Sequence, residues 1–257
     1  MRGGTEMLER LGEPEERNLP FARNRRCLKQ RCICDVHGEV TCFFYDGDEP
    51  HCPRCQENLR NAQLEREFRF SSHRIEVKRL LDDSGVDQSM QYMSVEGWES
   101  ISKDDDAAKS KVSKWIPSNR KFLLMLGGIG AGKTWMAIGI CNDLCRRKVS
   151  ARYITLSMLS MLVKATYGRN AVKTTSGLFK EFMKYDVLVL DEFLPKRWDD
   201  FLESLVLERD LLGKRTVFVS NMDEEEVSET VGAHVMSRIN GSGDVALFLD
   251  EDRRNMD

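Results

Sequence analysis

One glycine-rich segment restricts the possible fold more than any other feature of this chain. Residues 127–134 read Gly-Gly-Ile-Gly-Ala-Gly-Lys-Thr, which fits the pattern G-x-x-x-x-G-K-[ST]. That pattern has structural meaning when it joins a strand to a helix. Lys121–Leu126 is a short apolar run suited to a buried parallel strand, and Trp135–Cys145 is suited to a helix. A glycine-rich turn that matches by chance would not have these flanks.

The same segment indicates a phosphate-binding loop. Its glycines let the backbone curl so that successive N–H groups face phosphate oxygens, and the following helix points its N-terminus at them. Lys133 supplies a charge for the β- and γ-phosphates, and the Thr134 hydroxyl is suited to Mg²⁺. The residues predicted to bind the nucleotide are Gly127, Gly128, Ile129, Gly130, Ala131, Gly132, Lys133, Thr134 and Trp135.

Strand and helix patterns alternate from about Leu80 onward, which predicts an α/β domain with a parallel sheet flanked by helices. Ligands of such sheets gather at the carboxyl ends of the strands. The predicted strands are Lys121–Leu126, Ala151–Leu156, Val187–Leu190, Thr216–Ser220 and Val245–Leu249. The predicted helices are Trp135–Cys145, Ser157–Thr166, Ser176–Lys184, Asp199–Leu212 and Glu224–Val231.

Two predicted strands end in polar residues that suit nucleotide hydrolysis. Val187–Leu190 is followed by Asp191, a candidate magnesium ligand, and by Glu192, a candidate general base for the attacking water. An isolated Asp-Glu pair is usually a surface turn, but the buried run before this pair favours the catalytic interpretation. Asn221 follows another apolar run and can contact the γ-phosphate or the lytic water; the alternative is that it caps a turn.

Six of the eight cysteines lie between Cys27 and Cys55. Cys34-x₂-His37 and Cys52-x₂-Cys55 can form two tight turns that together offer three sulfurs and one nitrogen to a zinc ion. A fold of this size needs such a metal, and a closed four-ligand site is structural rather than catalytic. Alternatives remain open: Cys32 or Cys42 can replace His37, Cys27 and His51 are spare ligands, or the thiols bind no metal.

These features predict three regions. Residues 1–60 form a zinc-ribbon-like N-terminal domain with a strand in Glu39–Tyr45, residues 61–84 form a helical linker, and residues 85–257 form the ATPase domain. Glu57–Leu81 has roughly helical apolar spacing. Lys103–Lys114 is polar and predicts a loop or an exposed helix.

Composition and charge limit the partners and the cellular location that we expect for this chain. A net charge of −3 in 257 residues gives no overall basic field for nucleic acid, so a DNA contact depends on local patches. No apolar run reaches the roughly 18 residues that span a membrane. Residues 1–20 lack the apolar core of a signal peptide. We therefore expect a cytoplasmic protein without a membrane partner.

Several blocks resemble the DnaC/DnaI/IstB group of AAA+ ATPases, and most closely the helicase loaders of bacteria and their phages. The resemblance covers about residues 80–250. It is carried by Gly127–Thr134, Tyr185–Glu192, Leu207–Arg209, Lys214–Thr216, Ser220–Asn221 and Val231–Arg238. The Cys34 to Cys55 segment also resembles the zinc module that precedes the ATPase in many phage DnaC-like proteins.

The resemblance implies a function. Such loaders use ATP and Mg²⁺, self-associate through the ATPase domain, grip a DnaB-type hexameric helicase and place it on single-stranded DNA. It implies that Arg238 is an arginine finger for a neighbouring subunit's nucleotide. Little chain follows Arg238, so we expect no C-terminal lid domain. The alternative within the group is an IstB-like transposition ATPase that acts on duplex DNA with a transposase. The predicted catalytic residues are Lys133, Asp191, Glu192, Asn221 and Arg238.

Overall fold

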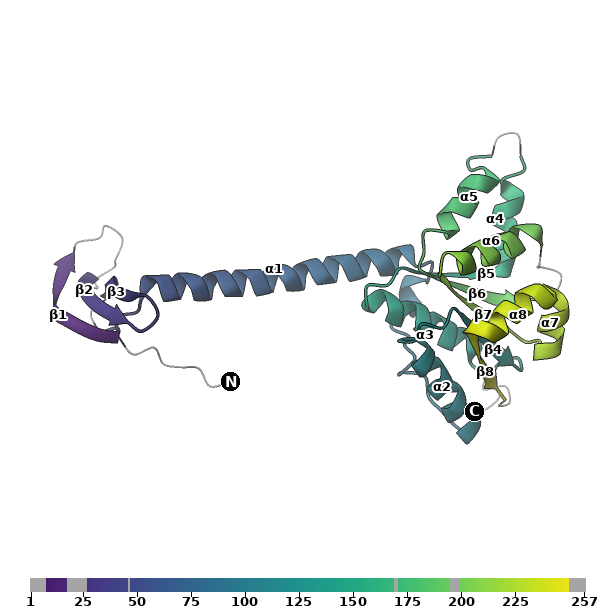
Figure 1. Ribbon diagram of the computed structural model, residues 1–257, viewed down its shortest axis with the longest axis horizontal. Helices are drawn as coiled ribbons and strands as arrows, with labels where there is room; N and C mark the ends of the chain where they lie inside the picture. The colour runs from purple at the N-terminus through teal and green to yellow at the C-terminus, as the bar shows by residue number, and fades with distance from the viewer. Residues whose placement is uncertain (1–7, 18–26, 46, 169–170, 195–198, 250–257) are drawn as a thin grey trace. The chain divides into compact units, whose positions relative to one another are not determined.

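The chain divides into two compact units, Met1–His73 and Arg74–Asp257. The computed structural model in Figure 1 describes residues 8–17, 27–45, 47–168, 171–194 and 199–249. None of the helices in these ranges is long and apolar enough to cross a membrane.

The N-terminal unit is built on a three-stranded antiparallel sheet in the order β1-β2-β3. Its strands are β1 (Leu8–Arg17), β2 (Cys27–Cys34) and β3 (Gly38–Tyr45). The strand predicted in Glu39–Tyr45 is therefore confirmed, whereas β1 and β2 were not predicted. Strand geometry puts alternate residues on one face, and Cys32, Cys34, Val40 and Cys42 pack there with Cys52 and Cys55 into a small core.

Helix α1 (Pro53–Asp83) confirms the helix predicted in Glu57–Leu81 and begins directly after Cys52. Most of its side chains are exposed, but Leu80 is buried in the core of the second unit. Because the two compact units divide within this helix, between His73 and Arg74, the predicted domain limits at residues 60 and 85 stay predictions.

The second unit contains a five-stranded, fully parallel sheet in the order β5-β6-β7-β4-β8. All five predicted strands are present, with limits that differ by three residues or fewer. The strands are β4 (Phe122–Gly127), β5 (Ala151–Thr155), β6 (Val187–Phe193), β7 (Arg215–Ser220) and β8 (Gly243–Phe248).

Helices cover both faces of this sheet, as the predicted α/β architecture requires (Figure 1). One face, with Leu123, Val189 and Val217, packs against α2 (Lys103–Trp115) and α3 (Lys133–Arg146). The other packs against α4 to α8. These helices are α4 (Leu156–Ala165), α5 (Thr175–Phe182), α6 (Asp200–Leu211), α7 (Glu224–Val231) and α8 (Ala233–Ser242).

Helix α2 differs from the loop or exposed helix predicted for Lys103–Lys114. It buries Asp105, Ala108, Val112 and Trp115, and the Trp115 Nε1–H donates to the Phe122 carbonyl at 2.8 Å. The many lysines and aspartates of this segment hide a stripe at three- and four-residue spacing, which is the spacing of a helix face. The expected absence of a lid domain stays a prediction, because residues 250–257 lie outside the described ranges.

Candidate functional site: a phosphate-binding loop and a Cys/His cluster

The glycine-rich loop runs from the end of β4 to the start of α3, as its flanks predict. Gly132 is the N-terminal cap of α3 and has a φ of 86°, which favours glycine. A side chain there would also lie 2.6 Å from Nε1 of Trp98. At Gly127 a side chain would overlap the carbonyl of Phe248. Both glycines are therefore required by the close packing that shapes the loop.

A cavity of about 620 Å³ opens beside this loop at the carboxyl ends of β4, β6 and β7. Its size is within the range of small-molecule sites. It is lined by Ile129, Gly130, Ala131, Gly132, Lys133, Thr134, Asp191, Glu192, Phe193, Leu194, Val219, Ser220 and Asn221. The structure thus brings most of the predicted nucleotide-binding and catalytic residues together around one space.

Lys133 is buried at the start of α3, and its ammonium group is held by the loop itself. Nζ donates to the Gly127 carbonyl at 2.8 Å and to the Gly128 carbonyl at 2.5 Å. Burial lowers the pKa of Lys133, and the negative charge of Asp191 partly opposes that shift. These two carbonyls hold the ammonium group at the wall of the cavity.

The carboxylate of Asp191 is buried and its two oxygens have different donors. Oδ2 accepts from the Tyr153 hydroxyl at 2.8 Å, and Oδ1 accepts from the Glu192 backbone N–H at 2.7 Å. Burial beside Asp191 raises the pKa of Tyr153, so this hydroxyl keeps its proton and acts as a donor. Two fixed donors orient the carboxylate at the cavity wall.

Glu192 has a φ of 58°, a left-handed conformation that is unusual for a residue other than glycine. The pairing of β6 with β7 shifts register at this point, between Leu190 and Phe193. The turn exposes the Glu192 side chain, and its Oε2 accepts from the Ser157 hydroxyl at 3.2 Å. Strained backbone at a cavity containing two acids is typical of a functional site.

Tyr153 and Ser157 were missed by the sequence reasoning. They come from β5 and from the first turn of α4, which is capped by the Thr155 side chain. Both positions follow from the sheet order, since β5 pairs directly with β6 and Thr155 lies opposite Asp191. In the sequence, Tyr153 lay inside the predicted strand Ala151–Leu156 and Ser157 began the predicted helix Ser157–Thr166, and neither position signalled a contact with the acids.

Asn221 lies at the cavity, as predicted, and its side chain is exposed. The preceding Ser220 is buried, accepts from the Met222 N–H at 3.0 Å and donates to the Phe193 carbonyl at 2.7 Å. Ser220 therefore ties the end of β7 to the residue that follows the two acids. The role of Asn221 at a phosphate or a water stays a prediction.

Four predicted residues lie outside the described lining of this cavity. The carbonyls of Gly127 and Gly128 accept hydrogen bonds from Lys133, which itself lines the cavity. Trp135 is half-buried and packs edge-on against Tyr92, with ring centroids 5.8 Å apart. Arg238 lies on α8, where its Nη1 donates to Asp210 Oδ2 at 2.7 Å.

The position of Arg238 excludes direct contact with the phosphates of its own loop. Asp210 also pairs with Lys121, the residue immediately before β4, at 2.8 Å. The strand from Lys121 to Gly127 rises about 3.3 Å a residue, hence about 20 Å in all. The cavity lies at the carboxyl ends of the strands. The guanidinium group of Arg238 therefore lies near their amino ends, on the opposite side of the sheet from the cavity.

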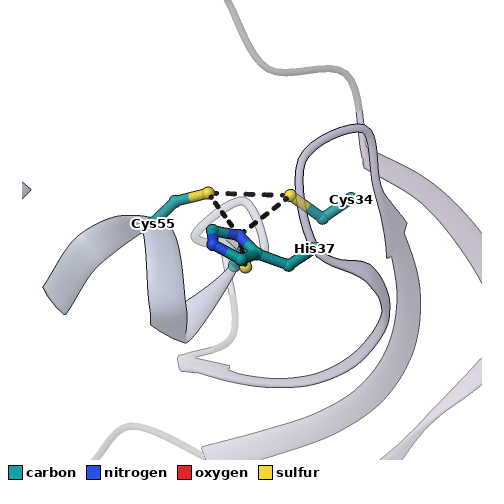
Figure 2. A group of neighbouring side chains, drawn as sticks. Cys34, His37 and Cys55 are labelled. Atoms are coloured by element: carbon teal, nitrogen blue, oxygen red, sulfur yellow. Dashed lines mark hydrogen bonds between the residues drawn. The ribbon is translucent and has the colours of Figure 1, made fainter. Parts of the chain in front are cut away.

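The N-terminal unit brings Cys34, His37, Cys52 and Cys55 together, the set selected by the spacing of the sequence. Their ligand atoms all lie within 4.8 Å of one another. Figure 2 shows Cys34 on the β2 side and Cys55 on α1, both facing His37. Sγ of Cys34 is 3.6 Å from Sγ of Cys55, and Nδ1 of His37 is 3.8, 3.6 and 3.2 Å from the sulfurs of Cys34, Cys52 and Cys55.

These distances fit a tetrahedral zinc site. Zinc–sulfur bonds of about 2.3 Å and zinc–nitrogen bonds of about 2.0 Å place two sulfurs of a tetrahedron roughly 3.8 Å apart and a sulfur and a nitrogen roughly 3.5 Å apart. All eight cysteines are free thiols, so no disulfide competes for the sulfurs. Cys32 and Cys42 are buried in the same small core but lie outside the four-residue group. The choice of ligands stays a prediction.

The fold and the cavity define a P-loop ATPase of the AAA+ class, with a parallel sheet, a phosphate-binding loop after β4 and two acids at the carboxyl end of β6. Comparison with known proteins is more specific. The chain belongs to the family of IstB-like ATP binding proteins, which matches residues 61–238. The expected ATP-binding and ATPase activities agree with that family.

Individual relatives cover different lengths of the chain. The replicative helicase loader DnaC of Escherichia coli K12 is 27% identical over 220 residues, which are 82% of this chain and 88% of DnaC. An ATP-binding protein of insertion sequence IS1162 from Pseudomonas fluorescens is 33% identical over 79 residues, 31% of this chain and 32% of the relative. The crystal structure of DnaI superposes with a TM-score of 0.53 at 20% identity, covering 66% of this chain and 94% of that one.

Proposed function

We propose that this protein is an ATP-dependent helicase loader. It binds a DnaB-type hexameric helicase and delivers it to single-stranded DNA when replication starts. The supporting observation is the length of the match to DnaC, which covers 82% of this chain. The unit Arg74–Asp257 is 184 of 257 residues, so the match extends beyond the ATPase unit into residues of the N-terminal unit.

In this proposal the cavity beside the loop binds ATP. The Lys133 ammonium group leaves the two carbonyls that hold it and pairs with the β- and γ-phosphates. Thr134 and Asp191, which both line the cavity, would hold Mg²⁺, and the metal would neutralise phosphate charge. The Tyr153 hydroxyl keeps the Asp191 carboxylate aligned. Glu192 accepts a proton from the attacking water, and Asn221 orients that water or the γ-phosphate.

Self-association is the second part of the proposal. The strand from Lys121 to Gly127, about 20 Å long, separates the contact of Arg238 from the loop of its own subunit. A role of Arg238 at a phosphate therefore requires the nucleotide of a neighbouring subunit. An arginine supplied across an interface stabilises the charge of the transition state. When hydrolysis removes the γ-phosphate, this contact is lost and the assembly loosens, so ATP acts as a switch for release.

The N-terminal unit is assigned to the helicase contact. Its Cys/His cluster holds β2 against the start of α1, and a zinc ion bound by Cys34, His37, Cys52 and Cys55 would stabilise a unit that has little other core. Zinc has no catalytic part in this proposal, because four protein ligands leave no open position.

The second candidate is an IstB-like ATPase that acts on duplex DNA with a transposase. The family name and the 33% identity to the IS1162 protein support it. That match covers 31% of the chain, compared with 82% for DnaC. The loader therefore has the broader support.

Co-sedimentation with a purified DnaB-type helicase tests the proposal. The wild type, Arg238→Ala and the control Arg120→Ala are each mixed with helicase, with and without ATP and a single-stranded oligonucleotide. The proposal predicts a complex for the wild type and the control, and delivery of the helicase onto DNA that Arg238→Ala lacks. If no variant binds helicase under any nucleotide condition, the loader assignment is wrong. ATP-dependent binding to duplex DNA would then favour the transposition ATPase.

A further inference from the structure

Asp210, the penultimate residue of α6, makes the contact that holds Arg238. Its side chain is about nine-tenths buried, with a residue exposure of 7%. The two carboxylate oxygens pair with different cations: Oδ1 with Lys121 Nζ at 2.8 Å, and Oδ2 with Arg238 Nη1 at 2.7 Å. Lys121 Nζ also donates to the Asp210 carbonyl at 2.9 Å. The carboxylate is therefore fixed in place before any partner is considered.

Arg238 is held at one corner of its guanidinium group. Among the described residues, the guanidinium group contacts Asp210 through Nη1 alone. The side chain of Arg238 is 41% exposed. Nε and Nη2 keep three N–H donors in a planar group that is suited to phosphate. An inhibitory contact that kept Arg238 away from a phosphate would be expected to bury the side chain. It would also pair two guanidinium nitrogens with the two carboxylate oxygens of Asp210, which is the usual bidentate geometry.

The surroundings of Asp210 are rigid on both sides. The neighbouring Arg209 is fully buried and donates to backbone carbonyls on three segments. On the α8 side, the Ser242 hydroxyl donates to the Arg238 carbonyl at 3.0 Å, and the Lys121 N–H donates to the Ser242 carbonyl at 2.8 Å. The contact between Asp210 and Arg238 thus joins two elements that are each anchored independently.

We propose that Asp210 is a positioning residue for Arg238: it fixes Nη1 so that Nε and Nη2 face a neighbouring subunit's nucleotide. This inference rests on the proposed role of Arg238. An unrestrained arginine has to lose rotamer entropy when it engages a phosphate. An arginine that is already restrained loses less rotamer entropy, so Arg238 would engage the phosphate of a neighbouring subunit more favourably in the assembled protein.

The charges favour this arrangement. Burial by itself would raise the pKa of Asp210, but hydrogen bonds and charge from Lys121 and Arg238 outweigh burial and lower the pKa. Asp210 is consequently ionised at neutral pH and remains an acceptor for both cations. The two cations leave one net positive charge in the group of three, carried to the surface by the half-exposed Arg238.

A double-mutant cycle tests the proposal in the full-length protein. ATP hydrolysis per molecule is measured against protein concentration for the wild type, Asp210→Asn, Arg238→Ala and the double variant. ATP-dependent self-association is measured in parallel by sedimentation velocity. We expect Asp210→Asn to lower kcat of the assembled protein roughly 10- to 100-fold, the effect of a small misplacement of a catalytic group, with KM for MgATP unchanged. The double variant should match Arg238→Ala, since the two residues act as one unit.

Two further variants serve as controls. Arg120→Ala removes the half-exposed cation next to Lys121, which lies near Asp244 rather than Asp210, so its kcat should stay within about threefold of the wild type. Asp210→Glu keeps the charge and moves the carboxylate by one methylene group. If Asp210→Asn does not fold, Asp210→Glu should still lower kcat without lowering the unfolding midpoint.

The possible failures differ from one another. An increase in kcat for Asp210→Asn would show that the contact is inhibitory, and effects of Asp210→Asn and Arg238→Ala that add independently would show that they are unrelated; either overturns the positioning role alone. If Arg238→Ala hydrolyses ATP and assembles like the wild type, or if the wild type does not assemble with ATP, the proposed function of Arg238 is wrong and this inference falls with it.

Discussion

Replacing Arg209 by methionine should destabilise the ATPase unit strongly, although the residue is not at the cavity. Arg209 is one of the largest fully buried side chains. Nη1 donates to the carbonyls of Phe182 and Tyr185 at 3.0 and 2.9 Å, and Nη2 donates to the carbonyl of Arg215 at 2.6 Å. Nε donates to the Thr216 hydroxyl at 3.2 Å. One cation therefore joins the end of α5, the start of β7 and α6.

The magnitude follows from what methionine leaves behind. Four carbonyls, including that of Asp186 at 3.4 Å from Nη2, and one hydroxyl lose their charged donor, and each buried acceptor that is left unsatisfied costs about 1–3 kcal/mol. Some of this is offset, because a buried cation is itself unfavourable: burial lowers the pKa of Arg209 to about 10. Methionine preserves the apolar stem, so little packing is lost. We expect a net decrease of about 3 kcal/mol in the free energy of unfolding.

Chemical and thermal unfolding followed by tryptophan fluorescence measures this effect, since all four tryptophans lie within Arg74–Asp257. For a unit of this size about 3 kcal/mol corresponds to a fall of roughly 6–12 °C in Tm. Arg120→Met is the matched control, because the Arg120 side chain is half-exposed and its ion pair with Asp244 is long, at 4.0 Å. Its free energy of unfolding should stay within about 0.5 kcal/mol of the wild type. An Arg209→Met midpoint equal to that of the control would refute the argument and show that water replaces the guanidinium group.

Three more outcomes follow from the two sites. Lys133→Ala should abolish the rise in unfolding temperature with MgATP, which for the wild type at 100 Kd corresponds to about 2.7 kcal/mol; an unchanged ATP affinity would contradict the loop assignment. Cys52→Ser should lose one equivalent of zinc in metal analysis while Cys42→Ser retains it, with the ATPase unit folded in both; zinc retained by Cys52→Ser would point to other ligands. Tyr153→Phe removes a hydrogen bond to a buried carboxylate, worth about 1.5–3 kcal/mol, and should shift the magnesium dependence of ATP hydrolysis. Ser157→Ala should change kcat without that shift, and equal magnesium curves for all three proteins would contradict the assigned role of Tyr153.

The sequence was sufficient for the sheet and the loop because both depend on local pattern. A buried parallel strand needs an unbroken apolar run, and the loop needs glycine where a side chain would meet Trp98 or Phe248. Helix α2 was harder to predict because its buried stripe contains Asp105 among apolar residues. The hydroxyl of Tyr153 was not predictable as a partner of Asp191, since that contact depends on which strand lies beside β6.

The same limit explains how Arg238 could be identified by resemblance while Asp210 could not. An arginine at a subunit interface is recognised within a contiguous block of sequence, whereas its anchor is 28 residues away on another helix. Lys121, which completes the group, is 89 residues from Asp210 and immediately precedes the strand that enters the phosphate-binding loop. The strand β4 therefore has the phosphate-binding loop at its carboxyl end and the residue that helps to hold Arg238 at its amino end. In the proposed assembly both ends of the strand are needed, because each cavity would receive its arginine from the next subunit.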